Sequence, residues 1–126
     1  MEFPGDLKYT KDHEWVRVEG DSAVVGITEF AQEELGEIVF VELPPVGSEF
    51  KAGDTLCVVE STKAASDVYA PISGKIAAVN DALGDSPDKV NSSPYSDGWM
   101  VKFEGIDAAE IEALMDSATY QGVAQS

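Results

Sequence analysis

One lysine, Lys63, stands in a short polar break between two apolar runs, in the stretch VVESTKAASDV from Val58 to Val68. The residues on either side of it are small, so nothing bulky shields its amine from a modifying enzyme. The nearest charges, Glu60 and Asp67, favour the ammonium form, whereas a Schiff-base lysine needs a lowered pKa. An exposed lysine is most often ordinary solvated surface. Here, however, it suits covalent attachment better than catalysis, since a hairpin-tip lysine can carry a cofactor on a flexible arm.

The other candidate groups form no catalytic set. His13 stands alone in KDHEW, and because a metal site needs several ligands, we predict a structural role for it. Cys57, the single cysteine, lies in an apolar run and is predicted to be a buried free thiol in a reducing compartment. The sequence shows neither a serine in a nucleophile elbow nor a Gly-rich phosphate loop, and we do not expect an enzyme.

The elements that must hold Lys63 are mostly short strands. Two strands within 14–27, joined by the turn-forming Glu-Gly-Asp-Ser, predict a β-hairpin. A short helix is predicted near 28–35, with Thr28 able to cap it and Gly36 closing it. A strand over 38–41 must end before Pro44-Pro45, because proline cannot donate to a ladder.

Strands at 55–60 and 65–70 flank Lys63, and a turn at Thr62-Lys63 would pair Val59 with Ser66 and Cys57 with Val68. A further strand is expected at 76–79, a long ordered loop at 80–98 and a strand at 99–103. A helix near 107–116 should start at Asp107, with Glu110 completing a capping box. The tail from about 117 has no apolar pattern and is expected to be frayed. This pattern predicts one mainly β domain over residues 1–126, a sandwich or flattened barrel.

The charge of the chain excludes broad classes of partner. There are 24 acidic residues against 8 lysines and arginines, which gives a formal net charge of −16. Such a chain is unsuited to nucleic acid or to an anionic membrane surface. No apolar run approaches the roughly 20 residues that cross a bilayer, and we expect neither membrane association nor export.

Several ordered motifs, read together, are similar to those of a known family. They are KDHEWV (11–16), VGIT (25–28), LGEIVFVELP (35–44), VESTKAASDV (59–68), APISG (70–74) and NSSPYSDGWM (91–100). Over about 7–114 the chain resembles the H-protein family of the glycine cleavage system. The resemblance implies a lipoyl-domain-like β-sandwich, or flattened barrel, with short helices near 28–35 and 107–116.

The same resemblance implies a carrier rather than an enzyme. Lys63 would bear lipoic acid in amide linkage. Glycine dehydrogenase (decarboxylating) would load an aminomethyl group, a tetrahydrofolate-dependent aminomethyltransferase would unload it, and dihydrolipoyl dehydrogenase would reoxidise the dithiol. A lipoylating enzyme would be a further partner. We expect a monomer in bacterial cytoplasm, or in the mitochondrial matrix if the chain is a processed eukaryotic protein.

Two further groups of residues follow from the resemblance. Glu60, Gly47 and Asp67 are candidates for recognition by the lipoylating enzyme, although Glu60 could equally be a solvated strand-end acid and Gly47 a turn glycine. A surface cleft would shelter the loaded arm. It would be lined by Glu14 and by the helix at 28–35, which presents Phe30 and Glu34.

Three alternatives stay open. A biotinyl carrier shares the hairpin-tip lysine but normally brackets it with methionines, where this chain has Thr62 and Ala64. Lipoyl domains of 2-oxo acid dehydrogenases usually have aspartate directly before the lysine, and both rivals lack the NSSPYSDGWM segment. The third alternative is an unmodified binding module in which Lys63 has no special role.

Overall fold

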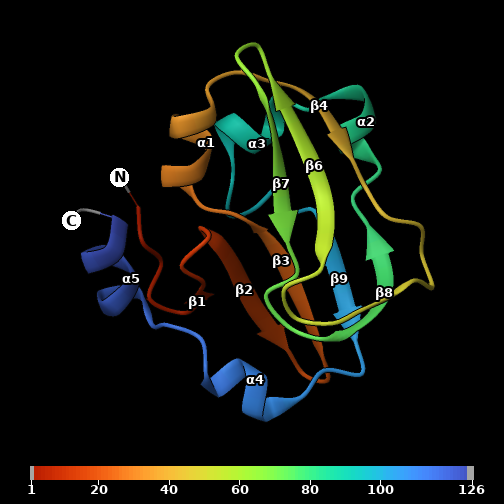
Figure 1. The fold of residues 1–126 in the computed structure, drawn as a ribbon, viewed down its shortest axis with the longest axis vertical. Helices are drawn as coiled ribbons and strands as arrows, with labels where there is room; N and C mark the ends of the chain where they lie inside the picture. The colour runs from red at the N-terminus through yellow and green to blue at the C-terminus, as the bar shows by residue number, and fades with distance from the viewer. Residues whose placement is uncertain (1, 125–126) are drawn as a thin grey trace.

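Two antiparallel sheets form the frame of the fold, as the computed structural model of residues 2–124 shows (Figure 1). The six-stranded sheet has the order β1-β2-β3-β9-β8-β5, and the three-stranded sheet has the order β4-β6-β7. The strands of the larger sheet are β1 Lys8–Tyr9, β2 Glu14–Glu19, β3 Ser22–Ile27, β5 Glu49–Phe50, β8 Gly74–Val79 and β9 Val101–Glu104. Those of the smaller sheet are β4 Ile38–Glu42, β6 Thr55–Ser61 and β7 Ala65–Tyr69. The predicted mainly β sandwich is confirmed.

The main hydrophobic core lies between the two sheets, and a second, smaller hydrophobic cluster lies at one edge. Inward-facing side chains of both sheets form the main cluster, in which Val16 and Val25 of the larger sheet meet Val59 of the smaller. A second cluster gathers Tyr9, Trp15 and Tyr120. Trp15 lies opposite Gly26, where a Cβ would come within 2.7 Å of the indole ring, so only glycine leaves room for it. The packing of this second cluster therefore depends on the close approach of Trp15 to Gly26.

Helix α1, Glu29–Leu35, forms as its caps predict. The Thr28 hydroxyl accepts a hydrogen bond from the Ala31 N–H at 3.2 Å, which satisfies a free donor of the first turn. Gly36 ends the helix at φ +86°, a conformation that favours glycine, and its N–H donates to the Gln32 carbonyl. The helix packs Ala31 and Leu35 against the main core.

The expectation of a frayed tail from about 117 was wrong for residues 117–124, and its last two positions, 125 and 126, lie outside the described residues. Residues Ser117–Ala124 form helix α5, whose Tyr120 is fully buried and stacks on Tyr9 with ring centroids 4.6 Å apart. Only Tyr120 and Ala124 of this helix are buried, one residue per turn. Because so narrow a contact leaves almost no hydrophobic periodicity, the sequence pattern gave no warning of it.

Other boundaries differ in smaller ways. The expected loop at 80–98 contains two one-turn helices, α2 Ala82–Asp85 and α3 Lys89–Ser92. Helix α4, Ala108–Glu112, is shorter than the predicted 107–116. Asp107 caps it as expected, but Glu110 does not complete a capping box. Its carboxylate accepts instead from the N–H and hydroxyl of Ser73, a tertiary contact that replaces the local one.

Candidate functional site

Lys63 lies at the tip of the β6–β7 hairpin, which projects at the top of Figure 1. The turn closes by a hydrogen bond from the Ser61 N–H to the Ala64 carbonyl at 2.8 Å. The Ser61 hydroxyl oxygen also accepts from the N–H groups of Lys63 and Ala64, each at 3.1 Å. The predicted pairing of Val59 with Ser66 is confirmed, as is that of Cys57 with Val68. The backbone of the lysine is thus fixed while its side chain is exposed.

The side chain of Lys63 lies against the end of α1. Its Nζ donates to the Glu34 carbonyl at 3.3 Å, and the neighbouring Thr62 N–H donates to the Glu37 carbonyl at 3.0 Å. The tip of the hairpin therefore contacts the segment that connects α1 to β4.

A cleft of about 420 Å³ lies beside the hairpin. One wall comes from α1 and another from β7, and the residues before and within β2 complete it. Glu14, Phe30 and Glu34, which the family resemblance assigned to such a cleft, all line it, and Asp67 lines it too. The full lining is Asp12, His13, Glu14, Ile27, Phe30, Ala31, Glu34, Leu35, Ser66, Asp67 and Val68.

Glu14 is the buried acid of this cleft, with only 2% of its surface exposed. The Thr10 hydroxyl donates to one of its carboxylate oxygens at 2.6 Å, and the Tyr69 N–H donates to the other at 3.4 Å. Burial raises the pKa of Glu14 to about 7, since desolvation outweighs these hydrogen bonds. The group can therefore exchange a proton near neutral pH, and a cation placed beside it would favour its charged form.

His13 forms a rigid part of the cleft wall. It adopts φ 71°, its ring packs on Phe30 with centroids 4.6 Å apart, and its Nδ1 is 2.8 Å from the Tyr120 hydroxyl. The same hydroxyl is 2.7 Å from the Thr28 Oγ1. Burial lowers the pKa of His13, against the opposing charges of Asp12 and Glu34. These contacts agree with a structural role, and they bring in Tyr120, which no sequence pattern singled out.

Comparisons with known proteins show the relationship directly. The model of the family "Glycine cleavage H-protein" matches residues 7–126. The chain belongs to this family. The glycine cleavage system H protein of Enterobacter sp. (strain 638) is 57% identical over 124 residues, 98% of this chain and 96% of the relative. That of Myxococcus xanthus (strain DK1622) is 52% identical over 124 residues, with the same coverage of 98% and 96%.

A solved structure agrees with the fold. The crystal structure of a glycine cleavage system H protein from Mycobacterium marinum superposes with a TM-score of 0.85 at 41% identity, covering 94% of this chain and 96% of that one. The lipoyl-type H-protein fold predicted from the sequence is therefore confirmed.

In this member of the family, the three candidates for ligase recognition do not all lie together. Glu60 is exposed at the end of β6 and pairs with Ala65, next to the turn, and Asp67 is exposed on β7. Gly47 belongs to the β4–β5 connection, which lies far from the hairpin tip (Figure 1). Its φ is +93°, and its N–H donates to the Ile76 carbonyl at 2.8 Å. The structure brings Glu60 and Asp67 near Lys63, and it does not bring Gly47 there.

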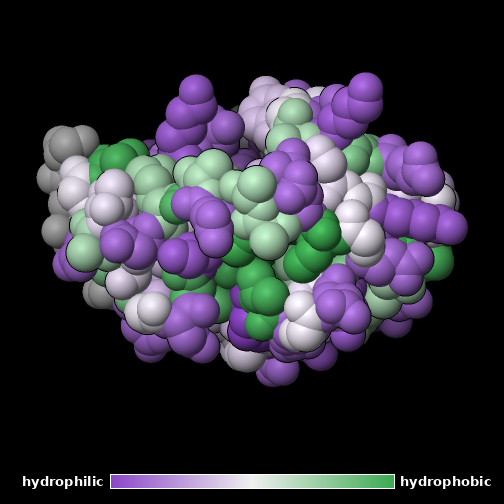
Figure 2. All heavy atoms as spheres, turned by 90° about the horizontal axis from the view of Figure 1, so that it is seen from below, coloured by the Kyte–Doolittle hydropathy of each residue, from purple (hydrophilic) through white to green (hydrophobic). Residues whose placement is uncertain are grey.

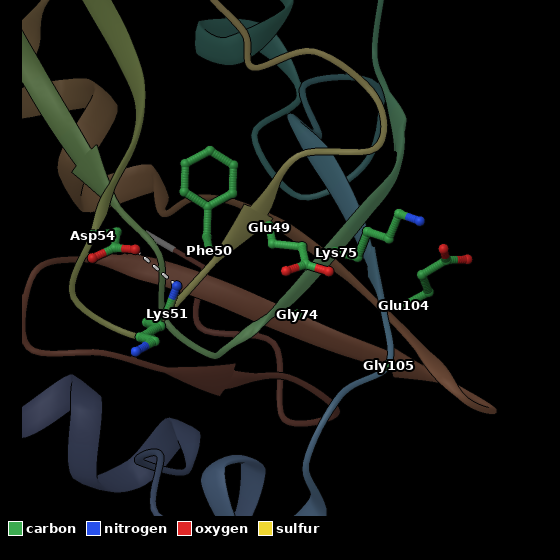
Figure 3. A pocket seen from close by; sticks show the side chains of 8 residues that line it. All are labelled: Glu49, Phe50, Lys51, Asp54, Gly74, Lys75, Glu104 and Gly105. Atoms are coloured by element: carbon green, nitrogen blue, oxygen red, sulfur yellow. Dashed lines mark hydrogen bonds between the residues drawn. The ribbon is translucent and has the colours of Figure 1, made fainter.

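Two wider depressions lie elsewhere on this H-protein fold. One, of about 720 Å³, is lined by Glu49, Phe50, Lys51, Asp54, Gly74, Lys75, Glu104 and Gly105. Its two lysine amines point in opposite directions, so its polar groups do not converge on one ligand (Figure 3). The other, of about 540 Å³, includes Val18, Ile106 and Ile111. Figure 2 views the face opposite the hairpin tip and shows apolar side chains scattered among polar ones.

The part of the chain that the structure describes offers neither a reactive thiol nor a metal site. Burial raises the pKa of the Cys57 thiol to about 12, so the thiol is unreactive at neutral pH. Within residues 2–124, no group of three or more His, Cys, Asp or Glu side chains could hold a metal ion. None of the helices described is long and apolar enough to span a membrane.

Proposed function

We propose that lipoic acid is joined in amide linkage to Lys63 and that this chain carries it among the enzymes of glycine cleavage. The observation that carries the proposal is the lysine itself, exposed at a hairpin tip that is fixed by four hydrogen bonds among Ser61, Lys63 and Ala64. A rigid base suits a long flexible arm, because only the arm then needs to move. The site fits lipoic acid, because the Lys63 amine is accessible and a cleft lies beside it.

The proposal includes the partners. Bound lipoate would supply a dithiolane that takes an aminomethyl group from glycine dehydrogenase (decarboxylating), yields it to the tetrahydrofolate-dependent aminomethyltransferase and is reoxidised by dihydrolipoyl dehydrogenase. The chain itself then acts as a shared substrate and not as a catalyst. The relatives named above are bacterial, which supports the expected cytoplasmic location. The proposal also takes the chain to be a monomer that moves between its partners.

The cleft would protect the arm between encounters. Phe30 and Ala31 offer an apolar wall that excludes water, while Glu14 offers a carboxylate inside it. A protonated amine would pair with the ionised Glu14 and lower its pKa, because opposite charges stabilise one another strongly where water is excluded. Glu34 and Asp67 stand at the exposed rim and would add to the negative field. The cleft therefore selects a cationic cargo.

Recognition by the lipoylating enzyme is assigned by the same proposal to Glu60 and Asp67, which are exposed beside the tip. Gly47 would contribute at a distance, by permitting the β4–β5 turn at its positive φ. Replacing Gly47 by alanine would then act through that turn and not by removing a contact.

Intact-mass measurement tests the carrier role. Protein expressed with lipoate available should gain a lipoyl-sized increment, and peptide mapping should place it on Lys63. Lys63→Arg keeps the fold and the charge but cannot form the amide, so it should remain unmodified and lose all glycine-dependent carbon dioxide exchange with the partner enzymes. A biotin-sized increment, or exchange that survives in the arginine variant without free lipoate, would overturn the proposal.

A further inference from the structure

Asn91 of α3 uses its whole side-chain amide on α1 and on the segment that follows it. Its Oδ1 accepts from the Ile38 N–H at 2.8 Å. Its Nδ2 donates to the Gln32 Oε1 and to the Gly36 carbonyl, each at 2.8 Å. An asparagine amide has two donor hydrogens and one acceptor oxygen, and all three functions are engaged here. In the sequence this residue stands out only as the first of the NSSPYSDGWM motif.

The segment held by Asn91 is the one on which the lysine rests. The Lys63 Nζ donates to the Glu34 carbonyl at 3.3 Å, and the Thr62 N–H donates to the Glu37 carbonyl at 3.0 Å. Gly36 lies between these two carbonyls along the chain. A Cβ on Gly36 would come within 3.0 Å of the Lys63 Cε, so the aliphatic stem of the lysine lies directly over the glycine. Residues 34–37 thus form a seat for the side chain.

We propose that Asn91 is a positioning residue for the carrier lysine: it holds the seat at residues 34–37 and thereby sets where the Lys63 Nζ lies. This inference rests on the carrier function proposed above and extends it from the attachment atom to what orients it. Asn91 touches neither the lysine nor the cleft in the contacts described, and it acts through Gly36 and Ile38.

The seat works for the free amine and for its amide. A free ammonium has three N–H donors, and an acylated Nζ keeps one, so the Glu34 carbonyl can accept from either form. Helix α1, which supplies that carbonyl, also presents Phe30, Ala31 and Leu35 to the cleft. A group attached to a seated Nζ therefore starts beside the helix that forms the cleft wall. A lysine without the seat would start in open solvent.

Chemical acylation of unmodified protein measures the seat without any partner enzyme. The probe is a limiting amount of an N-hydroxysuccinimide acetate ester, and mass spectrometry reports acetylation of Lys63 relative to the exposed Lys51 and Lys75 of the same chain. Asn91→Ala removes both donors and the acceptor for Ile38, and it adds no charge that would alter the protonation of the amine. The ratio for Lys63 should rise by roughly threefold, the size expected when one exposed hydrogen bond is lost. Ser92→Ala, an exposed neighbour on α3, should leave the ratio unchanged.

An unchanged ratio in a folded Asn91→Ala protein would overturn the proposal, as would an equal rise in Ser92→Ala. A second measurement uses the wild-type chain, in case the variant does not fold. A nuclear Overhauser effect between the Lys63 Hε and Gly36 Hα protons should be present in the unmodified protein, and its absence there would also overturn the seat. Neither readout requires lipoate to be attached, so a failed seat remains distinguishable from a failed carrier function.

Discussion

The hairpin tip and the cleft beside it differ in where their hydrogen-bond partners come from and in their exposure to solvent. At the tip, most of the hydrogen bonds that shape the turn join residues within 61–64, and one more runs from the Thr62 N–H to the Glu37 carbonyl. In the cleft, Glu14 depends on Thr10 and Tyr69, and His13 depends on Tyr120. The tip exposes a charged amine to solvent, and the cleft removes a carboxyl from it.

The hairpin tip is therefore suited to attaching a cofactor, and the cleft is suited to sheltering it. A group that several enzymes must reach belongs on a locally determined turn, because such a turn keeps its shape when one side of it is covered by a partner. A pocket that shelters a bound group must be enclosed, and its lining residues come from elements that are distant in sequence. The first feature was therefore visible in a short stretch of sequence, whereas the residues of the second came from the family resemblance and meet only where β2, β7 and α1 come together.

The largest expected effect that separates the two regions is the pH dependence contributed by Glu14. Its pKa rises from 4.5 to about 7 on folding, so the folded state holds the proton more tightly than the unfolded state. Stability from this group is complete below pH 4.5 and is lost as the pH rises through 7. The shift corresponds to at most about 3 kcal/mol over that window. Chemical denaturation of Glu14→Gln from pH 4 to 8 should therefore show a flatter profile than the wild type.

The matched control is Glu42→Gln, which removes an exposed carboxylate on β4 and should reproduce the wild-type profile. Parallel wild-type and Glu14→Gln curves would contradict the assignment of this titration to the cleft. In lipoylated protein that carries a cationic amine, the apparent pKa of Glu14 should fall, since the ammonium favours the carboxylate.

The hairpin and α1 were predictable because their signals are local. Thr28 and Gly36 bracket the helix by side-chain capping and by a positive φ, both of which depend on single residue types. The small residues around Lys63 and the apolar runs beside them likewise indicated the turn and its register, and the family resemblance assigned Glu14, Phe30 and Glu34 to a cleft that the structure does contain.

Tyr120 and Asn91 were missed for a physical reason. Each makes its contacts with residues more than 50 positions away, and no spacing rule links an isolated tyrosine or asparagine to such partners. The expected capping box at Glu110 failed in the same way, because Ser73 offered its carboxylate two donors that the helix start did not. Local rules predict which groups need partners, but the fold decides which partners they obtain.

A smaller effect is expected from the hydroxyl that joins α5 to the cleft. Tyr120→Phe keeps the ring stacked on Tyr9 but removes the partner of the His13 Nδ1 and the Thr28 Oγ1. The loss of these two hydrogen bonds should lower the free energy of unfolding by about 1–3 kcal/mol. Urea denaturation measures the loss. Tyr69→Phe, whose hydroxyl makes no hydrogen bond to the described residues, should change it little, and equal losses in both variants would show that α5 does not brace the cleft.

The smallest effect concerns association, and it tests whether the tip acts as a charged surface. The formal net charge is −16, and Glu34, Glu60 and Asp67 are exposed around Lys63. If partners approach this end through basic surfaces, the on-rate measured by stopped flow should fall roughly threefold between about 0.05 and 0.5 M salt, as screening shortens the reach of the field. Glu60→Gln should weaken that dependence, whereas Glu112→Gln on α4 removes the same charge from an element at the end of the molecule opposite the hairpin tip (Figure 1) and should not. An equal change in the two variants would mean that partners respond to total charge alone, and the tip would then serve only as the place of attachment.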